Sequence, residues 1–300
     1  MSERQQNLFD FAALAGRRDR AMRLGFAGGA DFLHCEVAGL MAERLAEVKR
    51  DFAKIALIGT GAGVVAAAVR PDGAGLTQLD PSPVMAAAVG AGVLTGETLP
   101  LEAGGHDLIV STLLLHLAND PVGQLIQMRH ALKPDGLMLA ALFGGQTLNE
   151  LRSSLAEAEV KCEGGLSPRV APMAEIRDLG GLLQRAGFAM PVADSERLVV
   201  TYATPLHLMR ELRAMGETSI LTARRRQPMR RATLMRACEI YAEHFGTPEG
   251  RVRATFEIVF LTGWAPAPDQ PKALRPGSAT ARLADALGAR EISAGEQAGE

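Results

Sequence analysis

The sequence predicts an α/β protein built on a doubly wound, mostly parallel sheet of seven strands with a helical insertion. Two observations carry this prediction. Short apolar runs alternate with helical stretches between Ile55 and Phe143, as parallel strands do when helices cover both faces of their sheet. A glycine-rich turn separates the first apolar run from the helix that follows it, and open α/β sheets bind ligands at that edge.

Residues 1–50 are expected to form an N-terminal helical cover ahead of the sheet. Phe32, Val37, Met41 and Leu45 recur at the spacing of one helix face. The apolar runs that predict the first strands are residues 55–59, 76–80, 108–115 and 137–143. The helices between them are expected at residues 64–69, 83–89 and 121–132.

Beyond residue 145 the pattern becomes mostly helical. Helices are expected at residues 147–160, 173–186, 205–215 and 228–245, and strands at 198–202 and 255–264. The last two helices begin with proline, which suits a first helical turn. We therefore expect a sheet domain at 51–265, with its helical insertion at about 146–250, and a largely irregular tail at 266–300 with a short helix at 281–287.

Composition argues against several kinds of protein. A formal net charge of −2 and an aromatic content of 4% argue against nucleic-acid binding. Cys35, Cys162 and Cys238 lie far apart without zinc-ligand spacing, so we expect no metal site and a reducing compartment. No apolar stretch indicates a signal peptide or a transmembrane helix. We expect a cytoplasmic protein in a bacterium, or one on the matrix side in a eukaryotic mitochondrion.

The turn after the first strand reads Leu57-Ile58-Gly59-Thr60-Gly61-Ala62-Gly63. Glycine adopts positive φ readily and lets the backbone approach a ligand, and the helix that follows offers free N–H groups. A dinucleotide-binding turn needs its third glycine at position 64, where this chain has valine. The observed spacing is typical of S-adenosylmethionine (SAM)-dependent methyltransferases. The alternative is a tight turn that binds no ligand.

Asp80 ends the second predicted strand, roughly 20 residues after the turn, where an acidic side chain can accept hydrogen bonds from ribose hydroxyls. The alternative is that Asp80 caps the helix that follows Pro81. Two positions depart from the methyltransferase pattern. Leu57 stands where an acidic residue usually precedes the glycines, and Glu97 is displaced by one position from the usual contact with adenine.

Several longer segments resemble one methyltransferase-like family. They are residues 111–120 (STLLLHLAND), 132–136 (LKPDG), 143–148 (FGGQTL), 150–152 (ELR), 163–168 (EGGLSP), 215–218 (MGET) and 277–280 (GSAT). In these segments the chain resembles the respiratory complex I assembly factor family, from about Phe9 to Thr280. It departs from the family at Leu57, and at Leu117, where tryptophan is common.

The resemblance implies a class I methyltransferase fold and a protein substrate, expected to be a complex I subunit, with a peripheral location at the inner membrane. Members of this family are associated with arginine hydroxylation and are related to the malonyl-carrier-protein methyltransferases of biotin synthesis. Methyl transfer and hydroxylation both stay open, because no sequence signature indicates a redox centre. The residues expected to bind SAM are Gly59, Gly61, Gly63, Asp80, Pro81, Glu97 and Ser111.

His116 is the candidate catalytic residue. It follows the fourth predicted strand at the carboxyl edge of the sheet, where it could act as a general base or contact a substrate. The alternative is a histidine that packs beneath the next helix. Asn119 and Asp120 are candidates for the cap of that helix, which begins at Pro121.

A run of arginines marks the late insertion. It comprises Arg224, Arg225, Arg226, Arg230, Arg231 and Arg236. Such a run is usually a solvated helix face. Our alternative hypothesis is that it docks an acidic partner or an anionic membrane surface.

Three hypotheses of function follow. The first is a SAM-binding enzyme that modifies a protein substrate during complex I assembly. The second is a non-catalytic assembly chaperone with a degenerate SAM site, and the third is a methyltransferase acting on a small molecule or a carrier protein. The glycine turn and Asp80 favour the first hypothesis, whereas Leu57 and Gly96 favour the second.

Overall fold

The computed structural model describes residues 7–26, 29–71, 73–270 and 288. The chain divides into two units, Met1–Pro266 and Ala267–Glu300, and the fold below is that of the first. The helix expected at 281–287 and the segment 277–280 lie outside the described residues.

Seven strands form one sheet in the order β3-β2-β1-β4-β5-β7-β6. They are β1 (Lys54–Ile58), β2 (Gly75–Asp80), β3 (Gly92–Val93), β4 (His106–Thr112), β5 (Leu132–Phe143), β6 (Ala189–Tyr202) and β7 (Val252–Trp264). The first five strands run parallel, and β7 pairs antiparallel with both β5 and β6. The predicted doubly wound, mostly parallel sheet of seven strands is confirmed.

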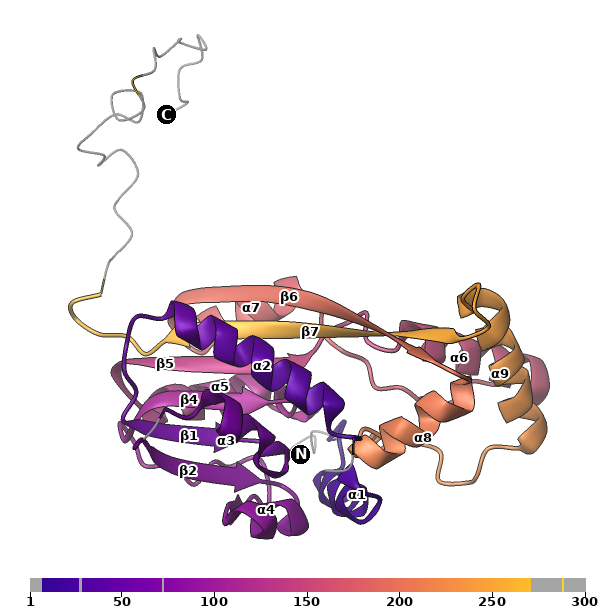
Figure 1. Cartoon of the computed structure of the whole chain (residues 1–300), viewed down its shortest axis with the longest axis horizontal. Coiled ribbons are helices and arrows are strands. Elements are labelled where there is room, and N and C mark those ends of the chain that lie inside the picture. The colour runs from indigo at the N-terminus through magenta and orange to yellow at the C-terminus, as the bar shows by residue number, and fades with distance from the viewer. Residues whose placement is uncertain (1–6, 27–28, 72, 271–287, 289–300) are drawn as a thin grey trace, which may run out of the picture. The chain divides into compact units, whose positions relative to one another are not determined.

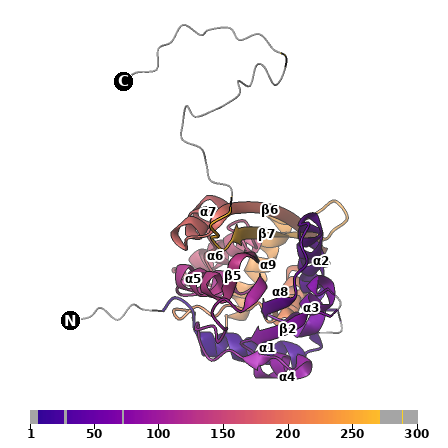
Figure 2. The same ribbon diagram turned by 90° about the vertical axis from the view of Figure 1, so that its left-hand side faces the viewer.

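Helices cover both faces of the sheet (Figure 2). They are α1 (Phe11–Arg23), α2 (Phe32–Glu47), α3 (Val64–Val69), α4 (Pro83–Val89), α5 (Pro121–Ala131), α6 (Asn149–Glu163), α7 (Ile176–Arg185), α8 (Pro205–Met215) and α9 (Arg231–Phe245). α2 and α3 share one apolar core with β1 and β4, whereas α5 and α7 share a second core with the opposite strand faces. Side chains alternate along a strand, so Leu57 belongs to the first core and Ile58 to the second.

The helical insertion is carried on long strands. β6 and β7 extend past the parallel strands towards α6, α8 and α9 (Figure 1). Glu150 on α6 connects the helical insertion to β7. Its buried carboxylate accepts hydrogen bonds from the amide N (3.2 Å) and the Oγ1 (2.5 Å) of Thr255. Helix starts follow the sequence signals, since Asp120 caps α5 by accepting a hydrogen bond from the amide N of Gly123 (2.8 Å).

Several boundaries differ from the prediction. β5 begins at Leu132 rather than at residue 137, and the short strand β3 was not predicted. β6 begins at Ala189 rather than at residue 198. Its side chains alternate in exposure, and Pro191 and the polar residues 194–197 conceal the strand in the sequence. α9 begins at Arg231, and residues 224–230 lie outside any helix. The solvated helix face is therefore wrong for Arg224, Arg225, Arg226 and Arg230, whereas Arg231 and Arg236 do lie on α9. Arg224 pairs instead with Asp10 (2.9 Å), and Arg225 pairs with Glu163.

Candidate functional site

The glycine turn connects β1 to α3 and has a backbone that glycine adopts most readily. Gly59, Gly61 and Gly63 have φ values of +87°, +52° and +102°. A Cβ on Gly59 would lie 2.4 Å from the carbonyl O of Thr112 on β4, and a Cβ on Gly61 would lie 3.0 Å from Cδ2 of His34. The turn therefore packs closely against β4 and α2, and position 59 has no room for a side chain.

The carboxylate of Asp80 is fully buried at the end of β2 and is held by the glycine turn. Its Oδ2 accepts hydrogen bonds from the amide N (2.9 Å) and Oγ1 (3.0 Å) of Thr60, and its Oδ1 accepts one from the amide N of Ser82 (2.8 Å). Ser82 caps α4, because its Oγ accepts a hydrogen bond from the amide N of Met85 (3.0 Å). The cap alternative for Asp80 is therefore wrong, and its contact with a ribose stays a prediction.

A small cavity of about 20 Å³ adjoins the end of β1, with Pro81 and Glu97 in its wall. The Oε1 of Glu97 accepts hydrogen bonds from the amide N and the Nδ2 of Asn119, both at 2.7 Å. Its Oε2 accepts one from the amide N of Asp120 (3.0 Å). Glu97 therefore organises the loop after β4, and both of its oxygens already have partners.

Helix α1 places a buried arginine beside Asp80, and sequence analysis did not identify this residue. Arg18 is 1% exposed, and its Nη2 donates a hydrogen bond to the carbonyl O of Leu113 (3.0 Å). Its Nη1 lies 3.8 Å from Oδ2 of Asp80, and its Nη2 lies 3.9 Å from Oε1 of Glu217. One cation thus lies between two carboxylates. The doublet of Arg17 and Arg18 gives no sequence signal for this, because only the packing of α1 decides which of them turns inward.

Four buried side chains around the turn have polar atoms without hydrogen-bond partners in the described part of the chain. These atoms are Nε and Nη1 of Arg18, both ring nitrogens of His34 and of His116, and Oγ of Ser111. Ser111 lies on β4 opposite Ile58 of β1, directly before the glycine turn. Unpaired buried donors and acceptors are unfavourable, so this group marks a place for a polar ligand.

His34 covers Gly61 from α2. Its ring packs edge-on against Phe26, with 5.1 Å between ring centroids, and the residue is 2% exposed. Burial, and then the charge of Arg18, lower the pKa of His34 to about 3, so the ring is neutral near pH 7.

Acidification is expected to destabilise the fold through His34. Its folded-state pKa of about 3 lies below the ordinary value of 6.5, so the unfolded chain takes up the proton first. The stability that this neutral ring contributes is complete above about pH 6.5 and is lost as the pH falls towards 3. Between pH 7 and pH 4.5, the His34→Gln variant should lose about 2–3 kcal/mol less unfolding free energy than the wild type.

Urea unfolding at both pH values measures this difference. Cys35→Ser provides the control, because Cys35 is an exposed neighbour on the same helix. This control should keep the wild-type dependence on pH. Equal losses in the wild type and His34→Gln would contradict the prediction.

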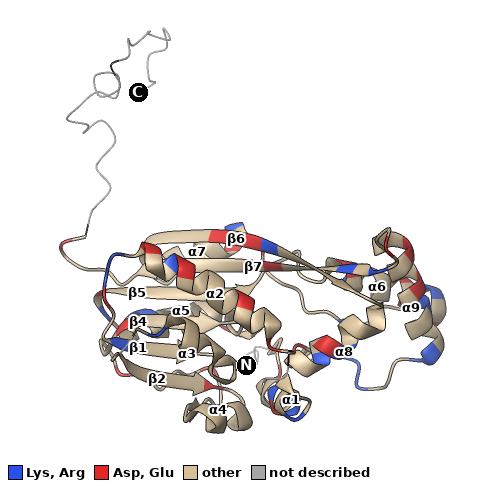
Figure 3. Ribbon diagram, in the orientation of Figure 1, with Lys and Arg blue, Asp and Glu red and all other residues tan. Residues whose placement is uncertain are grey.

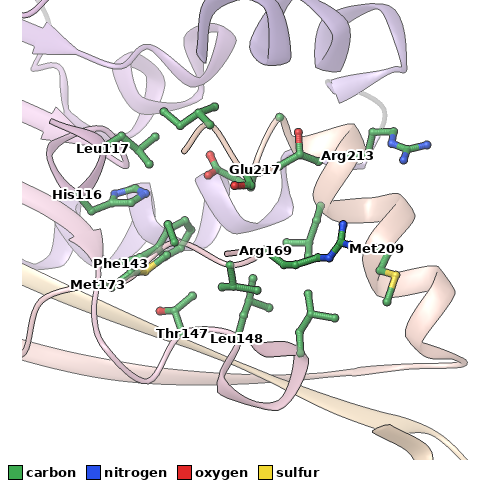
Figure 4. A pocket seen from close by; sticks show the side chains of 18 of the residues that line it. His116, Leu117, Phe143, Thr147, Leu148, Arg169, Met173, Met209, Arg213 and Glu217 are labelled. Atoms are coloured by element: carbon green, nitrogen blue, oxygen red, sulfur yellow. The ribbon is translucent and has the colours of Figure 1, made fainter. Parts of the chain in front are cut away.

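A larger cavity of about 310 Å³ lies between the carboxyl ends of β4 and β5 and the helical insertion (Figure 4). Its walls are mostly apolar and include Leu14, Leu117, Phe143, Leu148, Met173 and Met209. Leu14 and Leu117 also line the small cavity beside Pro81, so the two cavities adjoin at these side chains.

His116 lies in the short helix η3 (Leu115–Leu117) and lines the larger cavity. Its ring packs edge-on against Phe143 of β5, with 4.8 Å between ring centroids. Burial, and then the charge of Arg18, lower the pKa of His116 to about 3. The ring is therefore neutral near pH 7. A conjugate acid with so low a pKa makes it a weak base, so hydrogen bonding to a substrate suits it better than general-base catalysis, and its role stays a prediction.

Glu217 follows α8 and extends into the same cavity (Figure 4). Its side chain is 11% exposed, and the 3.9 Å contact with Arg18 is its only charged contact in the described part of the chain. Burial raises the pKa of Glu217, and the charge of Arg18 opposes this shift. Sequence analysis identified this residue only as part of the segment 215–218, without a role.

The wall opposite Glu217 is organised by Glu159 of α6. The Glu159 carboxylate accepts hydrogen bonds from the amide N (2.7 Å) and Oγ (3.1 Å) of Ser167 and from Nε of Arg169 (2.9 Å). Burial alone would raise the pKa of Glu159, but the bonds from Ser167 and Arg169 outweigh it and lower the pKa. The segment 163–168 therefore folds back onto α6 and delivers Arg169 to the cavity wall.

Leu57 does not face either cavity. It is fully buried on β1 in the same core as Leu33 and Val37 of α2. An acidic residue here would be enclosed by apolar side chains, which is unfavourable for a carboxylate. The packing of α2 on this strand therefore accounts for leucine at position 57.

The sheet order, the glycine turn after β1 and the acidic residue that ends β2 define a class I methyltransferase fold. A family profile described as a methyltransferase domain matches residues 57–140. The solved structure of the YcgJ protein from Bacillus subtilis has the same fold, with a TM-score of 0.52 and 14% identity, over 77% of this chain and 98% of that one.

More specific relatives match almost the whole chain. The arginine-hydroxylase NDUFAF5, mitochondrial, of Danio rerio is 35% identical over 295 residues, which cover 95% of this chain and 91% of the relative. A malonyl-[acyl-carrier protein] O-methyltransferase of Laribacter hongkongensis is 32% identical over 256 residues, covering 78% and 83%. The chain therefore belongs to the NDUFAF5 arginine-hydroxylase family and is related to these O-methyltransferases, which confirms the resemblance identified from the sequence.

Among the described residues, no helix is long and apolar enough to cross a membrane. No group of three or more His, Cys, Asp or Glu side chains among them is arranged to hold a metal ion.

Proposed function

We propose that this chain is a SAM-binding enzyme that modifies an arginine side chain of a protein partner during the assembly of respiratory complex I. One observation carries the proposal: Glu217 presents a mostly buried carboxylate, without a hydrogen bond among the described residues, inside an apolar cavity. A guanidinium offers several N–H donors that pair well with a carboxylate, and its apolar stem suits such walls. The name of the NDUFAF5 relatives, arginine-hydroxylase, supports the same side chain.

The polar groups around the glycine turn suit SAM as the cofactor. The Asp80 carboxylate would accept hydrogen bonds from the ribose hydroxyls of SAM. The unpaired Nε and Nη1 of Arg18 would donate hydrogen bonds to the carboxylate in the methionine part of SAM. When bound, SAM supplies an activated sulfonium methyl group beside the larger cavity. Leu14 lines both cavities and Arg18 contacts Asp80, so α1 borders the place where the cofactor would bind.

A non-catalytic assembly chaperone is the second candidate. The observation that favours it is the full enclosure of Asp80 by Thr60, Ser82 and Arg18. In that case SAM would not enter the site. Methyl transfer to a carrier protein is a third candidate, supported by the 32% identity to the O-methyltransferase.

Calorimetric titration with SAM and mass spectrometry of the partner separate these candidates. We expect SAM to bind the purified chain, and one arginine of a complex I subunit to carry one extra oxygen only in cells that express it. SAM does not supply this oxygen: one atom of O2 enters the arginine, and the other leaves as water with two electrons and two protons from a cellular reductant. The Glu217→Gln variant should keep SAM binding but lose the modification at least about a hundredfold, because the guanidinium loses its ionic partner.

Other outcomes would assign a different function. A gain of one methylene group on the arginine would indicate methyl transfer. An absence of binding heat at millimolar SAM, in a folded sample that still supports assembly, would favour the chaperone.

A further inference from the structure

Arginines from three segments lie near one another, and one of them lines the larger cavity. Arg17 and Arg20 lie one turn apart on α1, and Arg213 lies in the last turn of α8 and lines the cavity. Arg224 and Arg226 lie in the loop that follows α8. These five residues are called the arginine rim below.

The three segments are fixed to one another. The amide N of Asp10, which caps α1, donates a hydrogen bond to the carbonyl O of Ile220, and the amide N of Thr222 donates one to the carbonyl O of Leu8, both at 2.9 Å. A Cβ on Gly216, directly after α8, would lie 3.4 Å from the Cα of Arg18. Figure 3 shows Lys and Arg positions on α1 and in the loop that leads towards α9. The rim is therefore built by the fold rather than by one run of sequence.

Few acidic side chains balance this charge. Asp10 pairs with Arg224 (2.9 Å), and Asp19, the other acid of α1, accepts a hydrogen bond from Oγ of Ser82 (2.6 Å). Burial, then the charges of Arg20, Arg224 and Arg213, lower the pKa of Arg17, and Asp10 only partly opposes them. The Nε of Arg17 is also buried and has no hydrogen-bond partner in the described part of the chain.

Two arginines close to the rim in the sequence have acidic partners. Arg225 pairs with Glu163, and Arg236 pairs with Glu239 (3.0 Å). Within the rim only Arg224 has an ion pair among the described residues, and like charges gathered in this way repel one another, which favours the binding of an anionic ligand.

We propose that the arginine rim binds an acidic segment of the protein partner, next to the side chain that enters the cavity. This proposal depends on the proposed function in one respect, which is that a protein side chain enters the larger cavity. Arg213 lines the cavity, and Leu14, three residues before Arg17, lines it too. A peptide segment that enters the cavity therefore passes these groups.

Fluorescence anisotropy with two labelled peptides tests the rim. Both peptides carry a central arginine, flanked by glutamates in one and by glutamines in the other. At low salt, the glutamate peptide should bind the full-length protein at least about tenfold more tightly, and salt should reduce the difference. The triple variant Arg17→Gln, Arg20→Gln and Arg213→Gln should abolish the preference. Arg224 is left intact because it pairs with Asp10.

A control variant removes the same charge elsewhere. It carries Arg177→Gln, Arg185→Gln and Arg197→Gln, three exposed positions on α7 and β6. This variant should keep the preference for the glutamate peptide. Equal affinity for the two peptides, or the same loss in the control, would overturn the proposal.

Two further measurements distinguish peptide binding at the rim from membrane binding and from the proposed function. Binding to vesicles that contain phosphatidylglycerol, lost in the rim variant and unaccompanied by peptide binding, would overturn the proposal in favour of a membrane surface. A glutamate peptide whose central arginine is replaced by glutamine should still prefer the wild type over the rim variant. That result would support the rim even if SAM titration or Glu217→Gln contradicted the proposed function.

Discussion

Replacing Gly59 by alanine is expected to lower the free energy of unfolding by at least about 3 kcal/mol, a large share of the stability of a typical domain. Position 59 has a φ of +87°, which L side chains rarely adopt, and the new Cβ would lie 2.4 Å from the carbonyl O of Thr112. That oxygen belongs to the backbone of β4, which is fixed by its pairing with β1 and β5. The clash can be relieved only by moving the centre of the sheet.

Urea unfolding of Gly59→Ala measures this effect, and Gly96→Ala is its matched control. Gly96 borders the small cavity near the same turn, has no positive φ, and a Cβ there would meet nothing within 4 Å. The control should stay within about 0.5 kcal/mol of the wild type. A Gly59→Ala protein as stable as Gly96→Ala would show that the turn rearranges freely.

Much of the fold could be predicted because its signals are local. The buried strands are continuous apolar runs, and Pro83, Pro121 and Pro205 each begin a helix in the structure, as the sequence indicates. The start of β6 could not be predicted, because an edge strand that is exposed on alternate residues carries little hydrophobic signal. Pro228 misled the prediction of α9, since the helix begins only at Arg231.

The candidate site was predictable only where one segment carries it. The glycine turn and Asp80 form adjacent parts of one βαβ unit, and the structure joins them through Thr60. Arg18 and Glu217 could not be found in this way. They lie about 200 residues apart in the sequence, and their contact depends on how α1 packs against the end of α8.

The same packing makes α1 a shared wall of both cavities. Leu14 lines the small and the large cavity, and Arg18 reaches the carboxylates at the end of β2 and after α8. A substitution in α1 therefore affects both the predicted cofactor site and the predicted substrate site. Because of this coupling, substitution of Arg18 is expected to change the free energy of unfolding more than substitution of an exposed helix arginine.

Replacing Arg18 by methionine is expected to lower the free energy of unfolding by about 3 kcal/mol, because it leaves Asp80 and Glu217 without their common cation. The change also removes the donor to the carbonyl O of Leu113 and should raise the pKa of Glu217 further, since the charge of Arg18 holds that pKa down. Arg23→Met, at an exposed position of the same helix, should change stability by less than about 0.5 kcal/mol.

A double-mutant cycle shows whether the cation acts on Glu217 in particular. In the Arg18→Met protein, Glu217→Gln removes a carboxylate that has lost its partner, so the double variant should be more stable than the sum of the single effects by about 1–2 kcal/mol. Urea unfolding of the four proteins at pH 7 measures this coupling energy. Additive effects would contradict the pairing at 3.9 Å and would leave Asp80, 3.8 Å from Nη1, as the side chain that Arg18 serves.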